Sequence, residues 1–313
     1  MRQTATPNPT KSGFLGRMSM TRGEKHNFWL GLLFVSPWII GFLVFLAYPI
    51  VSSAYLSLTD FTGFGTPNFV GLENYQRMFQ DEIFYKALQN TLYYTVLAIP
   101  IGVVVALILA FAMNQALPEI GLYRTILYLP SILPAFAVSF IFIWLLNPKF
   151  GLVNLFLGMF GVPTIDWFGD PEWSKFAIVL LAQVGAGGNA LIFLAGLRGI
   201  PKTLYEAADI DGATPWHKFR FITLPLLTPV ILYNIITGLS GGLQVFESAY
   251  ITTGCGPADS TLFYVFYLYN NAFRYGQMGY ASALSWFLFI VSVLLAVLLF
   301  WWSKRWVNYE VVS

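Results

Sequence analysis

Few residues of this chain could take part in catalysis, and their spacing does not favour it. The two histidines, His26 and His217, have no cluster of cysteines or carboxylates at metal-ligand spacing around them. The sequence contains neither the Gly-x4-Gly-Lys-Ser/Thr loop that binds nucleotide phosphates nor the Gly-x-Ser-x-Gly turn that presents a serine nucleophile. Cys255 is the single cysteine, so no disulfide forms within the chain. We therefore expect no catalytic residue, no metal site and no cofactor bound by this chain, and we rank a membrane-embedded enzyme lowest.

Polar residues that could bind a solute lie instead inside two apolar segments, at about residues 174–197 and 226–249. Amide side chains near the middle of such a segment can hydrogen-bond an uncharged polar solute, and neighbouring glycines loosen the helix there. Depth and polarity alone select four candidates for a substrate path: Asn189, Asn234, Gln244 and Tyr250.

Close packing of helices is an equal alternative for the same segments. Gly238 and Gly242 form a Gly-x3-Gly pair, which by itself lets two helices approach each other. The sequence leaves both interpretations open, because one helix face can serve both purposes.

The composition places these segments in a membrane. Of 313 residues, 57% are hydrophobic and only 10% are charged, whereas soluble domains carry about 25% charged residues. The net charge of +2 is too small to favour a nucleic-acid partner. A span needs ~20 apolar residues, and six segments are long enough: 29–51, 92–114, 125–146, 174–197, 226–249 and 282–302. We predict an all-α polytopic membrane protein with six transmembrane helices.

The distribution of basic residues predicts on which side of the membrane the termini and loops lie. Twelve of the 17 Lys and Arg residues lie in the two tails and in the loops that follow the second and fourth segments. Because cytoplasmic loops are enriched in Lys and Arg, we expect both termini and the 198–223 loop in the cytoplasm. The first segment is longer than a signal-peptide core, so we expect it to remain uncleaved. The predicted domains are a basic cytoplasmic tail (1–27), a six-helix membrane domain (28–306) and a cytoplasmic C-terminal tail (307–313).

The expected spans contain almost no ionisable residue, Glu247 being the exception. Carriers driven by protons or sodium usually keep a charged relay at mid-depth, so its absence weighs against a secondary carrier or an ion channel. A secondary active solute carrier powered by an ion gradient stays as the alternative function.

The 198–223 loop is predicted to fold as a helix, a tight turn and a second helix. Pro201 suits a first helical turn, Gly212 suits a stop with positive φ, and Thr214 with Pro215 suits a new start. This outline also fits a DNA-binding helix-turn-helix, but the loop lacks a basic face and is tethered between two spans. An amphipathic helix held at the membrane surface favours docking into the groove of a protein partner.

Aromatic residues crowd the segment before the last span. They suit the apolar faces of sugar rings, but an aromatic belt at the membrane interface is the better interpretation. The cluster comprises Tyr264, Phe266, Tyr267, Tyr269, Phe273, Tyr275 and Tyr280.

The residues of the loop also resemble a known family. Glu206-Ala207-Ala208, Asp211-Gly212-Ala213, Phe219, Ile222, Leu224-Pro225 and Pro229 are similar to the EAA loop of binding-protein-dependent ABC importer permeases. The resemblance covers roughly residues 28–306 and is nearest to the maltose-type and glycerol-phosphate-type sugar permeases, which belong to the type I importers. Cys255 departs from the pattern, since that group commonly has a glycine there.

The resemblance implies a function and a set of partners. The helix with Glu206, Ala207 and Ala208 would be a coupling helix seated in a cytosolic ATPase dimer, which would bind ATP and magnesium. Asp211, Gly212 and Ala213 would form the turn of this ATPase-coupling element. A second permease of similar fold and an extracytoplasmic solute-binding protein would complete a transporter in the prokaryotic cell membrane. It would import a sugar or oligosaccharide by alternating access.

Overall fold

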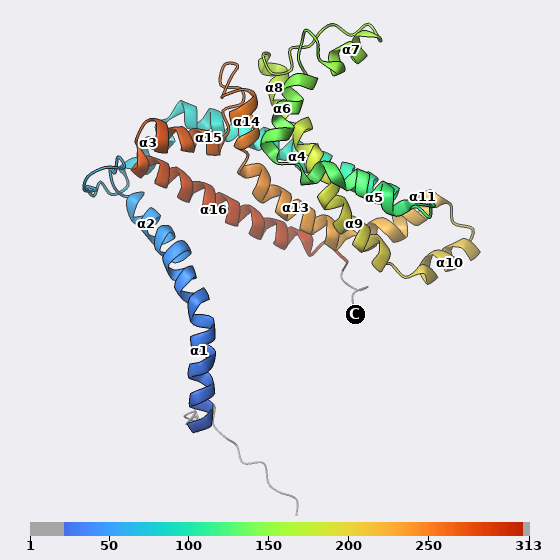
Figure 1. Cartoon of the computed structure of the whole chain (residues 1–313), viewed down its shortest axis with the longest axis horizontal. Helices are drawn as coiled ribbons and strands as arrows, with labels where there is room; N and C mark the ends of the chain where they lie inside the picture. Colours follow the sequence, from blue (N-terminus) through green and yellow to red (C-terminus); the bar gives the residue numbers. More distant parts are fainter. Residues whose placement is uncertain (1–21, 309–313) are drawn as a thin grey trace, which may run out of the picture. The chain divides into compact units, whose positions relative to one another are not determined.

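The computed structural model describes residues 22–308 and is almost entirely helical (Figure 1). Within these residues it contains no strand beyond one isolated bridge between Thr59 and Phe69. The all-α class predicted from the sequence is therefore confirmed. The predicted tails fall largely on residues 1–21 and 309–313, which lie outside the described residues. The chain divides into two compact units, Met1–Ser53 and Ala54–Ser313.

The first unit consists, in its described part, of one long apolar helix. Helix α1 (Arg22–Phe42) continues through a five-residue π-helical stretch (Leu43–Ala47) into α2 (Tyr48–Leu56), which runs into the second unit. Its large apolar side chains are exposed, as expected of a helix that faces lipid.

The second unit contains the remaining helices. In chain order they are α3 (Glu73–Gln80), α4 (Glu82–Met113), α5 (Ile120–Tyr128), α6 (Ala135–Leu145), α7 (Leu152–Gly158), α8 (Pro171–Ala182), α9 (Ala186–Gly199), α10 (Lys202–Ile210), α11 (Pro215–Lys218), α12 (Leu224–Leu226), α13 (Thr228–Leu243), α14 (Glu247–Thr252), α15 (Tyr264–Tyr269) and α16 (Met278–Ser303). Short 3-10 or π-helical stretches join several of them: η2 (Leu129–Ile132), η3 (Gln183–Gly185), η4 (Phe219–Thr223) and η5 (Asn270–Arg274).

Four to six segments of the described chain are long and apolar enough to cross a membrane. Four are continuous helices: His26–Leu56, Glu82–Met113, Pro171–Gly199 and Met278–Ser303. The other two are bent pairs, Ile120–Ile132 with Ala135–Leu145 at 94°, and Pro215–Leu226 with Thr228–Leu243 at 60°. All six predicted segments fall on these helices, but two expected spans are bent rather than straight.

Prolines account for both bends, because proline lacks the N–H group that would continue the hydrogen-bond ladder. Pro130 and Pro134 flank the first break, and Pro225 and Pro229 flank the second. The segment predicted at 226–249 is also displaced. Its helical pair begins at Pro215 and ends at Leu243, because residues 244–246 leave the helix before α14 begins.

Helix α4 is the centre of the second unit, and α13 and α9 both pack along it (Figure 1). Glycines allow the close approach. A Cβ added to Gly242 would lie 3.0 Å from the Thr95 side chain on α4, and one on Gly238 would lie 3.3 Å from Ile99. On α9, a Cβ on Gly196 would lie 2.8 Å from Val230 of α13. The packing interpretation of the Gly-x3-Gly pair is thus confirmed.

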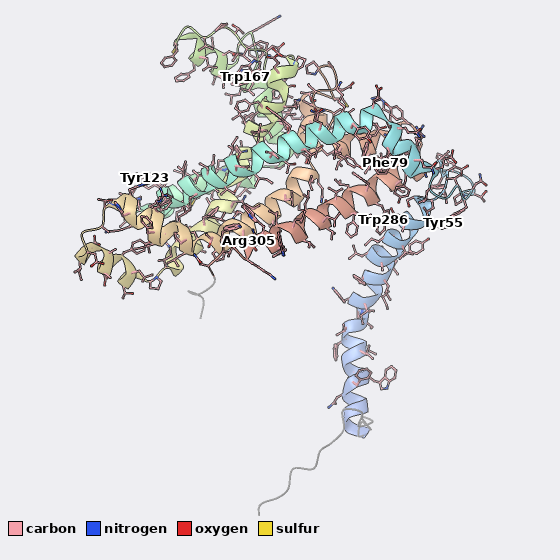
Figure 2. All side chains as sticks on the ribbon, turned by 180° about the vertical axis from the view of Figure 1, so that it is seen from behind. Tyr55, Phe79, Tyr123, Trp167, Trp286 and Arg305 are labelled. Carbon is pink, nitrogen blue, oxygen red and sulfur yellow. The ribbon has the colours of Figure 1, made fainter. Side chains whose placement is uncertain are left out.

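The two ends of the second unit consist of different helices. The α3 end carries α3, α15 and the start of α16, whereas the α10 end carries α10 and α11; Figure 2 labels Phe79 at the first and Tyr123 at the second. Several predicted belt residues prove to be core at the α3 end, since Tyr264, Phe266, Tyr267 and Tyr280 are buried. The belt interpretation is therefore wrong for these four side chains, while Phe273 and Tyr275 are exposed.

The Asp81 side chain connects three helices at the α3 end, namely α4, α15 and α16. Its carboxylate caps α4 by accepting from the backbone N–H groups of Ile83 (2.9 Å) and Phe84 (3.4 Å). The same carboxylate accepts hydrogen bonds from the hydroxyls of Tyr267 on α15 and Tyr280 on α16, the latter at 2.8 Å. One charged side chain therefore joins the starts of two candidate spans to α15.

These contacts define the ionisation of the cluster. Burial disfavours the charged carboxylate of Asp81, but the bonds from Tyr267, Tyr280 and the two backbone N–H groups outweigh it and lower its pKa below the ordinary 3.8. Burial, together with the bond to Asp81, raises the pKa of Tyr267 to about 12. The charged carboxylate of Asp81 and the protonated hydroxyl of Tyr267 are therefore the stable forms at neutral pH.

We expect Asp81→Asn to lower the melting temperature of the purified protein by roughly 2–4 °C at pH 7, because an amide oxygen accepts more weakly than a carboxylate. Since the folded-state pKa of Asp81 is depressed, its contribution is present above pH 3.8 and is lost as the pH falls further. The variant should accordingly show a shallower loss of stability in acid, measured by thermal unfolding in detergent between pH 3 and 7.

A matched control is Asp170→Asn. Asp170 also caps a helix, accepting from the backbone N–H of Glu172 at 2.9 Å. Asparagine caps helices as well as aspartate does, so this change should leave the melting temperature unaltered. Equal effects of the two substitutions would contradict the role assigned to Asp81.

Candidate functional site

A cavity of about 300 Å³ with amide side chains in its wall lies between α4, the α8–η3–α9 segment and α13. Two of the residues predicted for a substrate path, Asn189 and Asn234, line it together although 45 positions separate them in the sequence. The full lining comprises Tyr94, Ala98, Ile99, Gly102, Val103, Ala182, Gln183, Asn189, Asn234, Gly238, Gly241 and Gly242. No ionisable group other than the Tyr94 phenol takes part, so the cavity suits an uncharged polar molecule.

The local helix geometry creates this space. Between α8 and α9 the backbone tightens into the 3-10 turn η3, within the glycine-rich stretch that the sequence singled out. Gly102 on α4 stands opposite Gln183, and a Cβ there would lie 3.2 Å from the side-chain oxygen of Gln183. Gly238 and Gly242 both contact α4 and line the cavity, so one face of α13 serves helix packing and borders the cavity.

Asn234 is the most deeply placed polar side chain of the lining, with 3% of its surface exposed. Its amide nitrogen donates to the carbonyl of Val230 at 2.8 Å. Among the described residues, its side-chain oxygen has no hydrogen-bond donor. A buried acceptor without a partner costs about 1–3 kcal/mol, and a bound hydroxyl or a rearrangement of the site would have to supply the donor.

The other two predicted path residues lie elsewhere. Gln244 follows the end of α13, is exposed, and its amide approaches the Ser240 hydroxyl at 3.5 Å. Tyr250 lies on α14 beside Phe246, Phe266 and Tyr269, where it lines a different cavity. Gln244 was predicted to lie within an apolar segment at 226–249, directly before Tyr250, but the helix ends at Leu243.

Two lining residues were missed. Gln183 is an amide within an apolar segment, which is the same signal that identified Asn189 and Asn234. Tyr94 carries no such signal, since a tyrosine near the start of an apolar segment is indistinguishable from an interfacial aromatic.

The predicted helix-turn-helix is present between residues 201 and 226. Helix α10 ends in a turn in which Gly212 has φ +72° and the N–H of Ala213 donates to the carbonyl of Ala208 at 2.9 Å. This is a common glycine-dependent way to end a helix. Thr214 then caps the next helix by accepting from the N–H of His217 at 3.3 Å. The roles predicted for Gly212 and Thr214 within this fold are confirmed.

Contacts within the loop make it rigid. Lys218 forms an ion pair and hydrogen bond with Asp209 across the turn. The Tyr205 hydroxyl shares a hydrogen bond of 2.8 Å with the hydroxyl of Thr223. Tyr205, together with Ile222 and Leu226, packs against the buried cluster formed by α4 and α9. These contacts connect the two arms of the loop with each other and with α4 and α9.

The remaining face of the loop is open. Glu206, Ala207, Asp211 and Gly212 are exposed, while Ala208 and Ala213 are half-buried. The apolar stripe expected on α10 also reaches the surface, because Ile210 is 88% exposed and Leu204 is 40% exposed. An apolar and acidic surface on a rigid support is suited to contact with another protein.

The described residues contain no group of three or more His, Cys, Asp or Glu side chains placed to hold a metal ion. The fold therefore defines a multi-pass helical membrane protein. It has a cavity with amide side chains between its spans and an exposed helix-turn-helix at residues 201–226.

Comparison with known proteins identifies the family. Residues 98–308 match the family described as "Binding-protein-dependent transport system inner membrane component". The chain belongs to this family and is a permease of the ABC importer class, as the resemblance in the 206–213 region implied.

Similar proteins cover nearly the whole chain. A probable ABC transporter permease protein, YesP of Bacillus subtilis, is 37% identical over 298 residues, covering 94% of this chain and 96% of that protein. The lactose transport system permease protein LacF of Rhizobium radiobacter is 39% identical over 298 residues, covering 92% and 98%. A crystal structure of a bacterial alginate ABC transporter, in complex with an alginate pentasaccharide-bound periplasmic protein, has a chain with a TM-score of 0.79 and 26% identity, covering 90% of this chain and 96% of that one.

We expect Gly212→Ala to destabilise the loop by about 1–2 kcal/mol, because an alanine at positive φ brings its Cβ too close to the backbone. Gly212→Asn should cost less, since asparagine adopts this conformation more readily. Limited proteolysis of the purified protein should cut within 201–223 faster in the alanine variant than in the asparagine variant. Gly121→Ala, on α5 with open space around it, is the control and should leave the cleavage rate unchanged. Equal cleavage rates of the alanine and asparagine variants would show that the turn does not depend on the positive φ angle at residue 212.

Proposed function

We propose that this chain carries a sugar or oligosaccharide into the cytoplasm through the cavity that Asn189 and Asn234 line. That cavity is the observation on which the proposal rests: amides converge there inside the membrane-spanning bundle, without a charged group beside them. Amide donors and acceptors match the hydroxyls of an uncharged glycan, whereas a phosphoester would require Arg or Lys. The name of a similar protein, a lactose transport system permease, supports the same substrate class.

Transport would proceed by alternating access. The α8–α9 span and the α13 span both line the cavity, and the 201–223 loop connects them. A displacement of the rigid loop would change how these two spans face each other. Gln244 and Tyr250 would belong to the outer part of the path.

We assign the energy source to a separate cytosolic ATPase dimer, which would bind ATP and magnesium. Glu206, Ala207 and Ala208 on α10 would form the coupling helix, and Asp211, Gly212 and Ala213 its turn. The exposure of Glu206, Ala207, Asp211 and Gly212 favours this assignment. Glu206 would pair with a basic residue of the ATPase.

The proposed topology counts each bent pair as one span, which gives six. Both termini and the 201–223 loop would lie in the cytoplasm of a prokaryotic cell, with the six-helix domain at 28–306 between the tails 1–27 and 307–313. A second permease of similar fold would complete the pathway. An extracytoplasmic solute-binding protein would deliver the sugar, a role supported by the family description and by the periplasmic protein in the alginate transporter complex.

We expect Glu206→Arg to abolish ATP-dependent uptake and to release the ATPase from the purified transporter, because it reverses the charge at the proposed contact. Uptake of labelled sugar and co-purification in mild detergent would be measured side by side. Glu172→Arg is the control: Glu172 is also exposed but lies at the start of α8, and its substitution should change neither quantity. Uptake that persisted without any ATPase and collapsed with the ion gradient would instead establish a secondary carrier.

We expect Asn234→Leu to reduce sugar uptake about tenfold, the effect of losing roughly 1.4 kcal/mol of binding free energy, while leaving the ATPase attached. Leucine fills a similar volume without the amide, so the loss would report hydrogen bonding. Thr237→Val is the matched control on the same helix, because the Thr237 hydroxyl bonds only to backbone carbonyls of α13 and does not line the cavity. Unchanged uptake in Asn234→Leu would exclude this cavity from the path.

A further inference from the structure

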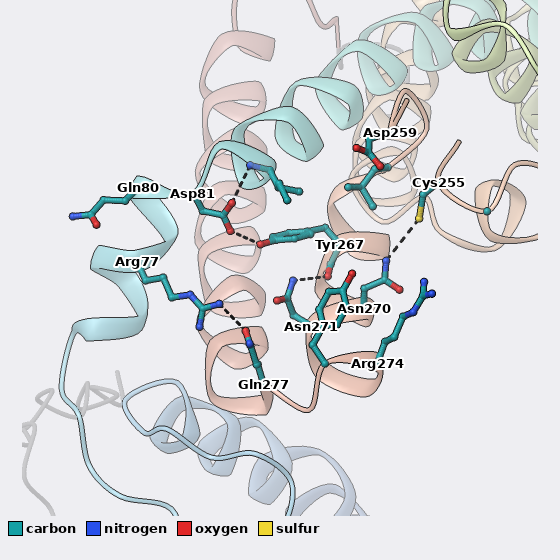
Figure 3. Close-up of a pocket in the computed structure, with 14 residues that line it drawn as sticks. Arg77, Gln80, Asp81, Cys255, Asp259, Tyr267, Asn270, Asn271, Arg274 and Gln277 are labelled. Atoms are coloured by element: carbon teal, nitrogen blue, oxygen red, sulfur yellow. Dashed lines mark hydrogen bonds between the residues drawn. The ribbon is translucent and has the colours of Figure 1, made fainter. Parts of the chain in front are cut away.

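A second and larger cavity, of about 760 Å³, opens at the α3 end of the chain (Figure 3). It shares no residue with the cavity between the spans. Its walls come from α3, η5 and the loop before α15, and they carry planar polar side chains that include Arg77, Asn270, Asn271, Arg274 and Gln277. Figure 3 shows Arg77 and Arg274 on different walls of this space.

The carboxylates of this cavity already have partners. Asp81 accepts from two tyrosines and two backbone N–H groups, and Asp259 lies 3.7 Å from the ammonium of Lys86. Within residues 22–308, neither Arg77 nor Arg274 forms an ion pair. Arg77 donates one hydrogen bond, of 2.8 Å, to the Gln277 side chain. The cavity is therefore rich in N–H donors that are available to a ligand with many oxygen atoms.

An aromatic cavity of about 540 Å³ adjoins the polar one. The two cavities share Gly254, Asn270 and Arg274 in their walls. The aromatic walls come from Tyr250, Phe266, Tyr269 and Phe273, and neighbouring rings in this group lie 5.1–5.9 Å apart.

Two of these aromatic rings have a free face. Tyr250 is 50% exposed and Phe273 is 68% exposed. Exposed aromatic faces beside guanidinium and amide groups are the combination that recognises sugars, because a pyranose ring presents C–H groups on its faces and hydroxyls around its rim. Both volumes also lie within the range of about 300–1,000 Å³ that is usual for small-molecule sites.

We propose that the two adjoining cavities form one trough that binds an oligosaccharide, with one sugar ring against Phe273 and Tyr250 and the next beside Arg274 and Asn270. The trough is a separate subsite from the cavity that Asn234 lines, so a chain of several sugar units is held at the α3 end before it enters the path. This inference rests on the proposed transport of sugars.

Cys255 provides a probe for the trough without any engineering. It is the single cysteine of the 313 residues, and it lines the polar cavity, where the Asn270 amide approaches its sulfur at 3.7 Å. The complete transporter in nanodiscs would be treated with a maleimide, and the alkylation rate of Cys255 would be measured with and without lactose, maltotriose, arabinotriose or an alginate trisaccharide. We expect the transported sugar, at a free concentration of about ten times its Kd, to slow alkylation about tenfold.

Four variants locate the bound sugar, each scored by the ratio of alkylation rates with and without sugar. Phe273→Ala and Arg274→Ala should abolish protection, because each removes a wall of the trough. Phe64→Ala, which removes an aromatic ring that is 91% exposed and lines neither cavity, should retain it. Asn234→Leu should also retain it, because its site lies in the other cavity.

The outcomes distinguish the trough from the transport function. Sugar uptake with no protection of Cys255 by any sugar would overturn the trough and leave the proposed function standing. Protection that disappeared in Asn234→Leu but persisted in Phe273→Ala would overturn it too, because the effect would then come from the inner cavity. If no sugar were either imported or protective, the proposed function would fall as well.

Discussion

The close approach of α13 to α4 is the constraint on which the rest of the structure depends. Two glycines on α13 lie against Thr95 and Ile99, so the helices touch at two points one turn apart. The same small residues leave the space that becomes the cavity. A larger residue at Gly242 would therefore both push the helices apart and fill the cavity. Close helix packing and the cavity both follow from the small size of these side chains, which is why the sequence could not separate the two interpretations.

The two ends of the bundle are held by different forces. At the α3 end, the charged carboxylate of Asp81 collects hydrogen bonds from two helices and a helix start, which favours a fixed arrangement. At the α10 end, the loop is rigid within itself but presents its outer face to the surroundings. The α3 end is therefore fixed by hydrogen bonds between its own elements, whereas the α10 end leaves an exposed surface.

Features that depend on neighbouring residues could be predicted from the sequence, and those that depend on distant residues could not. Gly212, Thr214 and the apolar segments are local signals, and the structure confirms each of them. Asn189 and Asn234 were each selected by depth and polarity, but only the structure shows that they line one cavity. The connections made by Asp81 could not be predicted, because its partners Tyr267 and Tyr280 lie nearly 200 positions away. Gln244 was misplaced because hydropathy continues through residues 244–246, although the helix does not.

The 60° bend between Pro215–Leu226 and Thr228–Leu243 divides this segment into two helical arms that meet at Leu227. Leu227, at the corner, is completely buried, so the corner is held in place while both arms extend from it. The 16 residues of α13 make the inner arm about 24 Å long. A rotation of about 10° around Leu227 would move the far end of that arm by about 4 Å, roughly the width of a methylene chain. In this geometry a small tilt of α13 about Leu227 corresponds to a much larger displacement at the far end of the helix than near the corner.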